Sequence, residues 1–152
     1  MGFNCVEEIH AFQLTRAFKL ECYRLIRGSP AARADFRFKS QIQEALSGAE
    51  SNISEGYRRW AAGEFAHFLA FAGASLEEGQ PSLQDGIDRE YFREGDCVDA
   101  RRLGLRAAKA TAALQTTERQ LAEENRRRKK RSRPRRRTKD HGPRTKDLGP
   151  RT

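Results

Sequence analysis

Basic side chains give this sequence its clearest chemical signal. Ten of the twelve residues between positions 126 and 137 are Arg or Lys, and only Ser132 and Pro134 interrupt them. Cations at this density neutralise phosphates and release their counterions, so the run should bind RNA or DNA with little sequence preference and a steep salt dependence. A tail that only improves solubility is the alternative. The predicted contacts are Arg126, Arg127, Arg128, Lys129, Lys130, Arg131, Arg133, Arg135, Arg136 and Arg137.

A smaller cluster, Arg58-Arg59-Trp60, places two cations beside an aromatic ring. Groups of this kind can hold a phosphate and stack on bases. A solvated loop whose Arg side chains reach into water is the alternative interpretation. Arg58 and Arg59 therefore join the predicted nucleic-acid contacts.

Two Glu-x-x-His motifs, Glu7…His10 and Glu64…His67, invite comparison with di-iron bundles, which use two such motifs and two further Glu residues. His67 lies between Phe65 and Phe68 and is turned away from their apolar stripe, and Glu7 and His10 lie near Met1, where a helix frays. We expect neither a metal nor another cofactor.

The sequence also gives no pairing of a nucleophile with a base and no Gly-rich phosphate loop, so we expect no enzyme activity. Cys5, Cys22 and Cys97 are widely spaced and form no Cys-x-x-Cys motif, which indicates reduced thiols. No signal peptide and no run of 18 apolar residues is present. We expect a cytoplasmic protein without a membrane partner.

Charge divides the chain into two parts. Residues 1–125 hold 16 Lys/Arg and 19 Asp/Glu, a net charge of −3, whereas residues 126–152 hold 14 Lys/Arg and two Asp, a net charge of +12. The segment 137–143 recurs as 144–150 with one substitution, and the repeat has no apolar periodicity that could offset chain entropy. We predict a folded domain over 1–125 and a disordered, low-complexity basic tail over 126–152. Its first turns can continue the preceding helix as far as Pro134 allows.

Apolar residues recur at helical spacing through most of the domain. The predicted helices cover residues 6–27, 36–55, 62–85 and from about 97 to beyond 121. Short connections make consecutive helices antiparallel neighbours. The fold prediction is therefore all-α: an antiparallel up-down-up-down four-helix bundle with a disordered basic C-terminal tail.

Local signals set the expected helix ends. Gly28-Ser29-Pro30 should end the first helix, Asp35 should cap the second, and Gly56 should stop it. Pro81 should kink or end the third helix near Gln80. The core stripe of the last helix is predicted to be Leu103, Ala107, Ala110, Leu114 and Leu121.

The second and third helices carry small and polar residues on faces where a plain bundle would carry Leu. Asn52 shares a face with Phe38, Ile42 and Ala49, and Ser75 shares one with Phe68. A buried amide without partners costs about 1–3 kcal/mol. Asn52 and Ser75 are therefore predicted to make polar contacts that fix the helix register, with a ligand-binding or catalytic role as the alternative.

These helices also carry a family resemblance. The matching positions are Gln41, Ala45, Asn52-Ile53, Glu55-Gly56, Arg59, Phe65, Phe68-Leu69, Ala72, Ser75 and Glu78. The pattern resembles the four-helix-bundle (S23-type) proteins encoded in intervening sequences of bacterial 23S ribosomal RNA genes, which are similar to the accessory variability determinant of diversity-generating retroelements. The resemblance runs from about Phe12 to Leu121, and the family usually has Ser-Ile at Gly48-Ala49 and Ala at Ser54.

The resemblance implies a non-enzymatic protein that assembles as a homopentamer and is tied to ribosomal RNA genes. It adds Gln41, Glu55 and Glu78 to Asn52 and Ser75 as structural polar contacts, with a hydrogen bond or a salt bridge between Glu55 and Arg59. Binding of RNA or another nucleic acid is the first functional prediction. An accessory subunit that holds a reverse transcriptase is the alternative.

Overall fold

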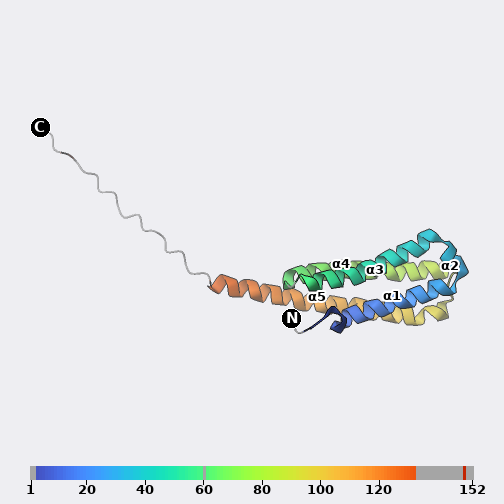
Figure 1. Cartoon of the computed structure of the whole chain (residues 1–152), viewed down its shortest axis with the longest axis horizontal. Coiled ribbons are helices and arrows are strands. Elements are labelled where there is room, and N and C mark those ends of the chain that lie inside the picture. Colours follow the sequence, from blue (N-terminus) through green and yellow to red (C-terminus); the bar gives the residue numbers. More distant parts are fainter. Residues whose placement is uncertain (1–2, 60, 133–148, 150–152) are drawn as a thin grey trace.

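The computed structural model describes residues 3–59, 61–132 and 149, and within them every regular element is a helix (Figure 1). This confirms the all-α prediction. A 3₁₀ turn precedes the first helix, and a second one, Glu94–Cys97, precedes the last. The elements are η1 Val6–Glu8, α1 His10–Gly28, α2 Pro30–Ala34, α3 Phe36–Arg58, α4 Ala62–Asp88, η2 Glu94–Cys97 and α5 Val98–Ser132.

Side-chain caps fix the corner between α1 and α3. The Ser29 hydroxyl accepts a hydrogen bond from the Ala32 backbone N–H (3.1 Å), which starts α2, a short helix that periodicity did not predict. The Asp35 carboxylate accepts from the Phe38 N–H (3.0 Å) and caps α3 as predicted. The Tyr91 hydroxyl donates to the same carboxylate (2.9 Å). One acidic residue thus joins the start of α3 to the segment that follows α4.

The predicted stop at Gly56 is wrong, and so is the predicted end near Gln80, which was one of two alternatives for Pro81. Helix α3 continues past Gly56 to Arg58, because Gly56 is packed against α4: a Cβ there would lie 2.7 Å from Phe65 and Phe68. Helix α4 continues through Pro81 to Asp88. Pro81 is on the exposed side, where water can satisfy the carbonyl that lacks its usual N–H partner, while Gly79 and Leu83 are buried on the other side. Packing overrides the local signal at both sites.

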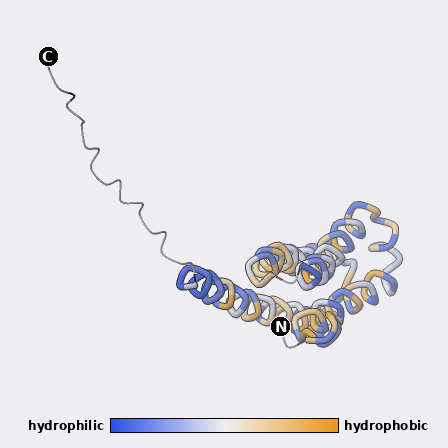
Figure 2. Tube along the Cα trace, turned by 60° about the vertical axis from the view of Figure 1, so that its left-hand side comes forward, coloured by the Kyte–Doolittle hydropathy of each residue, from blue (hydrophilic) through white to orange (hydrophobic). Residues whose placement is uncertain are grey.

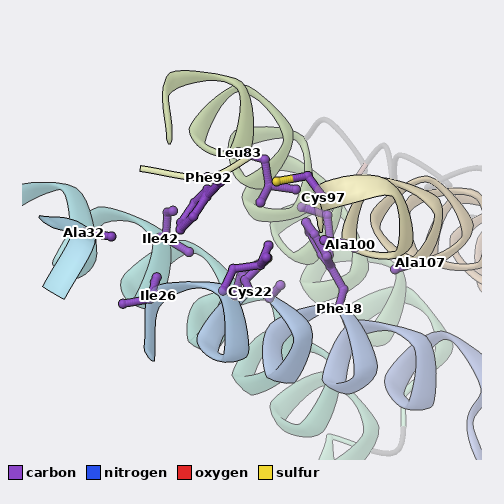
Figure 3. Packing of buried hydrophobic residues seen from close by; sticks show 14 of the residues in the cluster. Phe18, Cys22, Ile26, Ala32, Ile42, Leu83, Phe92, Cys97, Ala100 and Ala107 are labelled. Atoms are coloured by element: carbon purple, nitrogen blue, oxygen red, sulfur yellow. The ribbon is translucent and has the colours of Figure 1, made fainter. Parts of the chain in front are cut away.

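The long helices pack around a shared interior: α3 against α4, α4 against α5, α5 against α1 and α1 against α3 (Figure 1). Figure 3 shows part of the larger core cluster, in which Phe18 and Cys22 of α1 lie with Leu83 of α4, Cys97 of η2 and Ala100 of α5. Burial raises the pKa of both thiols, so they stay protonated.

The buried face of α5 differs from the predicted stripe. Leu103, Ala110 and Leu114 are only partly buried and Leu121 is exposed. Gly104 lies directly against α1 and α4. A Cβ there would lie 2.9 Å from Phe18 of α1 and would also collide with Gln80 of α4. The residues of α5 that are buried are Ala100, Gly104, Ala107, Thr111 and Glu118. Small residues thus set how closely α5 approaches its neighbours.

Helix α5 also reaches past the other helices. Its last turns extend beyond the ends of α3 and α4 and are strongly hydrophilic (Figures 1 and 2). Residues 126–132, which the prediction assigned to the tail, are helical here, so the boundary proposed after Asn125 falls inside α5. The seven-residue repeat lies outside the described residues, apart from Gly149.

Candidate nucleic-acid interface

The end of α5 carries the densest positive charge among the described residues. Residues 126–131 are six consecutive Arg and Lys residues, and all are exposed. Arg127 pairs with Glu123 of the same helix (3.8 Å), and no acidic side chain of the described residues lies within ion-pair distance of the other five. Because helical residues advance by about 100° each, these cations point to all sides of the helix. The predicted contacts Arg133, Arg135, Arg136 and Arg137 lie outside the described residues.

A groove forms where this part of α5 passes the start of α4. It encloses about 630 Å³, with Ala61, Ala62 and Gly63 on one side and Arg126, Arg128 and Lys129 on the other. Ala61 has no side chain that can cap α4, so the positive end of the helix dipole faces the groove without a capping oxygen. Both features favour an anion, and Glu64 in the first turn of α4 places one negative charge at the same end of the helix.

Arg58 and Arg59 are less available than the sequence suggested. Glu55 pairs with both, at 3.0 Å to Arg58 and 2.8 Å to Arg59. The Arg59 guanidinium also lies over the Phe68 ring, 5.7 Å from its centroid. The pair between Glu55 and Arg59 implied by the resemblance is therefore present. It also neutralises part of the charge that was predicted to bind phosphate, and Trp60 lies outside the described residues.

The other predicted polar positions lie along the line where α3 meets α4. Asn52 donates from its amide to the Gly48 carbonyl (2.9 Å), one turn earlier in its own helix. A Cβ on Gly48 would lie 3.6 Å from the Ser75 hydroxyl, so Ser75 faces α3. Gln41 and Glu78 line a groove of about 330 Å³ between the same helices. The structure brings these residues to one seam, and the register-fixing role of Asn52 stays a prediction.

Sequence reasoning missed the exposed rings of His67 and Phe71 on α4, beside which lies the half-buried Phe68. The rings of His67 and Phe71 are in edge-to-face contact, with centroids 4.6 Å apart, and Phe68 lies 6.4 Å from Phe71. Phe71 is 49% exposed. The signal was present in the spacing, because His67 and Phe71 are four residues apart on the side opposite to Leu69 and Leu76.

The sequence predicted no metal site, and the structure shows how the His, Cys, Asp and Glu side chains of the described residues are placed. Among residues 3–59 and 61–132, no three His, Cys, Asp or Glu side chains are grouped closely enough to hold a metal ion. Glu118 of α5 is 3% exposed, and its Oε2 has no hydrogen-bond partner among the described residues. Burial raises the pKa of this carboxyl above its ordinary value of 4.5.

The fold and this surface define an all-helical protein with a basic, projecting C-terminal helix. The sequence profile of the 23S rRNA-intervening sequence protein family matches residues 7–112, more than two thirds of the chain, and the chain belongs to that family. A search of curated proteins finds no match. The match gives no support to the retroelement accessory protein or to a reverse transcriptase partner, and it ends before the basic end of α5 begins.

No helix of the described part of the chain is both long enough and apolar enough to cross a bilayer.

Proposed function

We propose that this protein binds RNA in the cytoplasm as a non-enzymatic homo-oligomer, with the end of α5 as its main contact. The observation that carries the proposal is the row of exposed cations over residues 126–131, of which only Arg127 has an acidic partner among the described residues. Their charge is not used inside the described fold. Membership of a family named for 23S rRNA intervening sequences supports RNA over other polyanions.

The proposal includes a particular assembly. We infer that α1, α3, α4 and α5 form an antiparallel four-helix bundle and that five chains associate in a ring. Helix α3 ends at Arg58 and α4 begins at Ala62, and so short a connection supports an antiparallel turn. Light scattering should give five times the 17.3 kDa mass of one chain. A monomer mass across micromolar concentrations would contradict the assembly.

The binding proposal is tested by fluorescence anisotropy with labelled 23S intervening-sequence RNA. The full chain should bind, and a chain truncated after Asn125 should lose most of the affinity while keeping its helical circular dichroism. The truncated domain has a net charge of −3, which leaves little electrostatic attraction. Equal affinity of the two chains would overturn the role of the α5 extension.

A pull-down with and without nuclease then identifies the partner in the cell. Ribosomal RNA should be recovered with the protein, and proteins retained through RNA should disappear after nuclease treatment. A reverse transcriptase that stays bound after nuclease treatment would instead favour the accessory role.

A further inference from the structure

The exposed rings on α4 are not needed for the core. Phe65, Leu69, Ala72 and Leu76 of the same helix supply the buried contacts. His67 and Phe71 face outward and contact each other at 4.6 Å, and Phe68 connects them to the Arg59 guanidinium at 5.7 Å. Rings and a guanidinium arranged in this way form a surface on which flat aromatic groups can stack.

A groove links this surface to the basic end of α5. It encloses about 560 Å³ between α4 and α5, with His67 on the α4 side and Arg119 and Arg126 on the α5 side. It shares Gly63, Ala122 and Arg126 with the groove at the start of α4, so the two grooves are continuous. His67 thus lies in the same groove as Arg119 and Arg126, and Phe71 adjoins this path through its contact with His67.

We propose that this path binds single-stranded RNA, with unpaired bases stacked on His67 and Phe71 and the backbone held by Arg119 and Arg126. The inference rests on the proposed RNA binding and names the class of RNA. Bases in a duplex are already stacked on one another and cannot reach the rings, whereas unpaired bases can. Stacking is tolerant of sequence, because every base has an aromatic face.

Charge favours a polyanion as the occupant. The continuous path includes Arg119, Arg126, Arg128 and Lys129, whose positive charges complement the phosphates of a nucleic acid. Glu123 is the acidic residue that lines it, and its carboxylate pairs with Arg127. A polyanion with flat apolar groups matches both the charge and the rings.

The test measures the affinity of the full chain for three probes of about 12 nucleotides. The probes are an oligouridylate, an abasic strand with the same backbone, and a duplex. Phe71→Ala should weaken oligouridylate binding by about fivefold to a hundredfold, the range for losing one stacked base. Phe71→Leu should weaken it similarly, because it keeps the apolar volume but removes the ring. Affinity for the abasic strand and the duplex should stay unchanged in both variants.

Phe36→Ala is the matched control. Phe36 is also an exposed phenylalanine, 74% accessible, and it lies at the opposite end of α3 from Arg58 and Arg59. Its removal should leave all three affinities unchanged. Circular dichroism melts and light scattering confirm that each variant keeps the fold and mass of the parent chain.

Three results would overturn the inference. One is an equal effect of Phe71→Ala and Phe36→Ala on oligouridylate binding. Another is equal wild-type affinity for oligouridylate and for the abasic strand. If that affinity still depends on residues 126–152, the proposed RNA binding stands and only the stacking is refuted. The third is a smaller oligomer mass in Phe71→Ala, with affinities for all probes falling together, which would assign the rings to a contact between copies. Absence of binding to any RNA would refute the proposed function itself.

Discussion

Glu118 places an acidic side chain in a buried position of α5. Ala107, Thr111 and Glu118 lie on one side of the helix, and each is at most 3% exposed. An aliphatic residue would ordinarily occupy such a position, because a buried carboxylate is strongly disfavoured unless it is paired. The raised pKa is the consequence: the carboxyl gives up its charge more readily in the folded state than in the unfolded chain.

Glu118→Leu should therefore stabilise the domain in a pH-dependent way. Below about pH 4 the wild-type carboxyl is protonated in both states, and ionisation costs nothing. As pH rises from the ordinary pKa of 4.5 through the raised value of the folded state, the wild type loses stability and the variant does not. Urea unfolding at pH 7.5 should show a gain of about 1–3 kcal/mol. Exposed Glu124→Leu is the control, and a gain independent of pH would contradict the assignment.

Glu55 should limit nucleic-acid binding, because it pairs with both Arg58 and Arg59. Glu55→Gln frees two guanidinium groups near the proposed stacking surface. RNA binding should tighten severalfold, and the slope of log K against log salt should steepen by up to about 1.4, or 0.7 for each added phosphate contact. Glu44→Gln makes the same charge change at an exposed position of α3. Equal effects of the two variants would show that Glu55 acts only through net charge.

At the scale of single residues, sequence pattern predicted some roles and missed others. The cap at Asp35 and the pair between Glu55 and Arg59 were accessible because both depend on residues close in sequence. The Asn52 amide donates to the Gly48 carbonyl of its own helix, and its register-fixing role stays a prediction. The exposure of Phe71 and the burial of Glu118 depend on how α4 and α5 are rotated about their axes, and a single helical pattern does not fix that rotation.

Among the helices, α4 shows most clearly how packing decides the use of glycine. A Cβ on Gly86 would lie 2.6 Å from the Phe92 ring and 2.8 Å from Phe38, both of which are buried. A Cβ on Gly73 would meet no atom within 4 Å. The same residue type in the same helix therefore has opposite consequences at the two positions.

Alanine substitutions should separate these two glycines. Gly73→Ala should raise the free energy of unfolding by up to about 1 kcal/mol, because alanine favours the helix and fits the open space. Gly86→Ala should lower it, because overpacking typically costs about 1–3 kcal/mol and these rings leave no room for relaxation. Thermal melts followed by circular dichroism measure both changes. Stabilisation by Gly86→Ala would show that Phe92 can move away at little cost.

The positions of the long helices could be predicted, but several of their ends could not. Helical periodicity depends only on neighbouring turns, so it located α1, α3, α4 and α5. Gly56 was predicted to stop its helix and Pro81 to kink or end its helix, because their intrinsic preferences oppose helix. Phe65 covers Gly56, and the buried Leu83 anchors the turn after Pro81. Contacts between distant segments decided those ends, and they are absent from the local pattern.

In the whole molecule, the residues that form the packed core and the residues that carry most of the positive charge lie in different parts of the chain. The packed part of the chain is mildly acidic, and the net charge of +12 resides in residues 126–152. The structure divides this segment further, because residues 126–131 extend α5 and adjoin the grooves beside α4. Composition predicted the segregation of charge. Composition did not predict that residues 126–132 are helical; they are helical because α5 continues to Ser132.

Two truncations should show which part of the segment binds RNA. A chain ending at Ser132 keeps the six cations of residues 126–131, and a chain ending at Asn125 loses them as well as the eight that follow. If the α5 extension is the main contact, the step from Ser132 to Asn125 should account for most of the lost affinity. It should also reduce the salt slope by up to about 4, or 0.7 for each of six phosphates. Titrations between about 50 and 200 mM salt measure both quantities. A larger loss on removing residues 133–152, which carry eight of the fourteen cations, would move the main contact beyond the described helix.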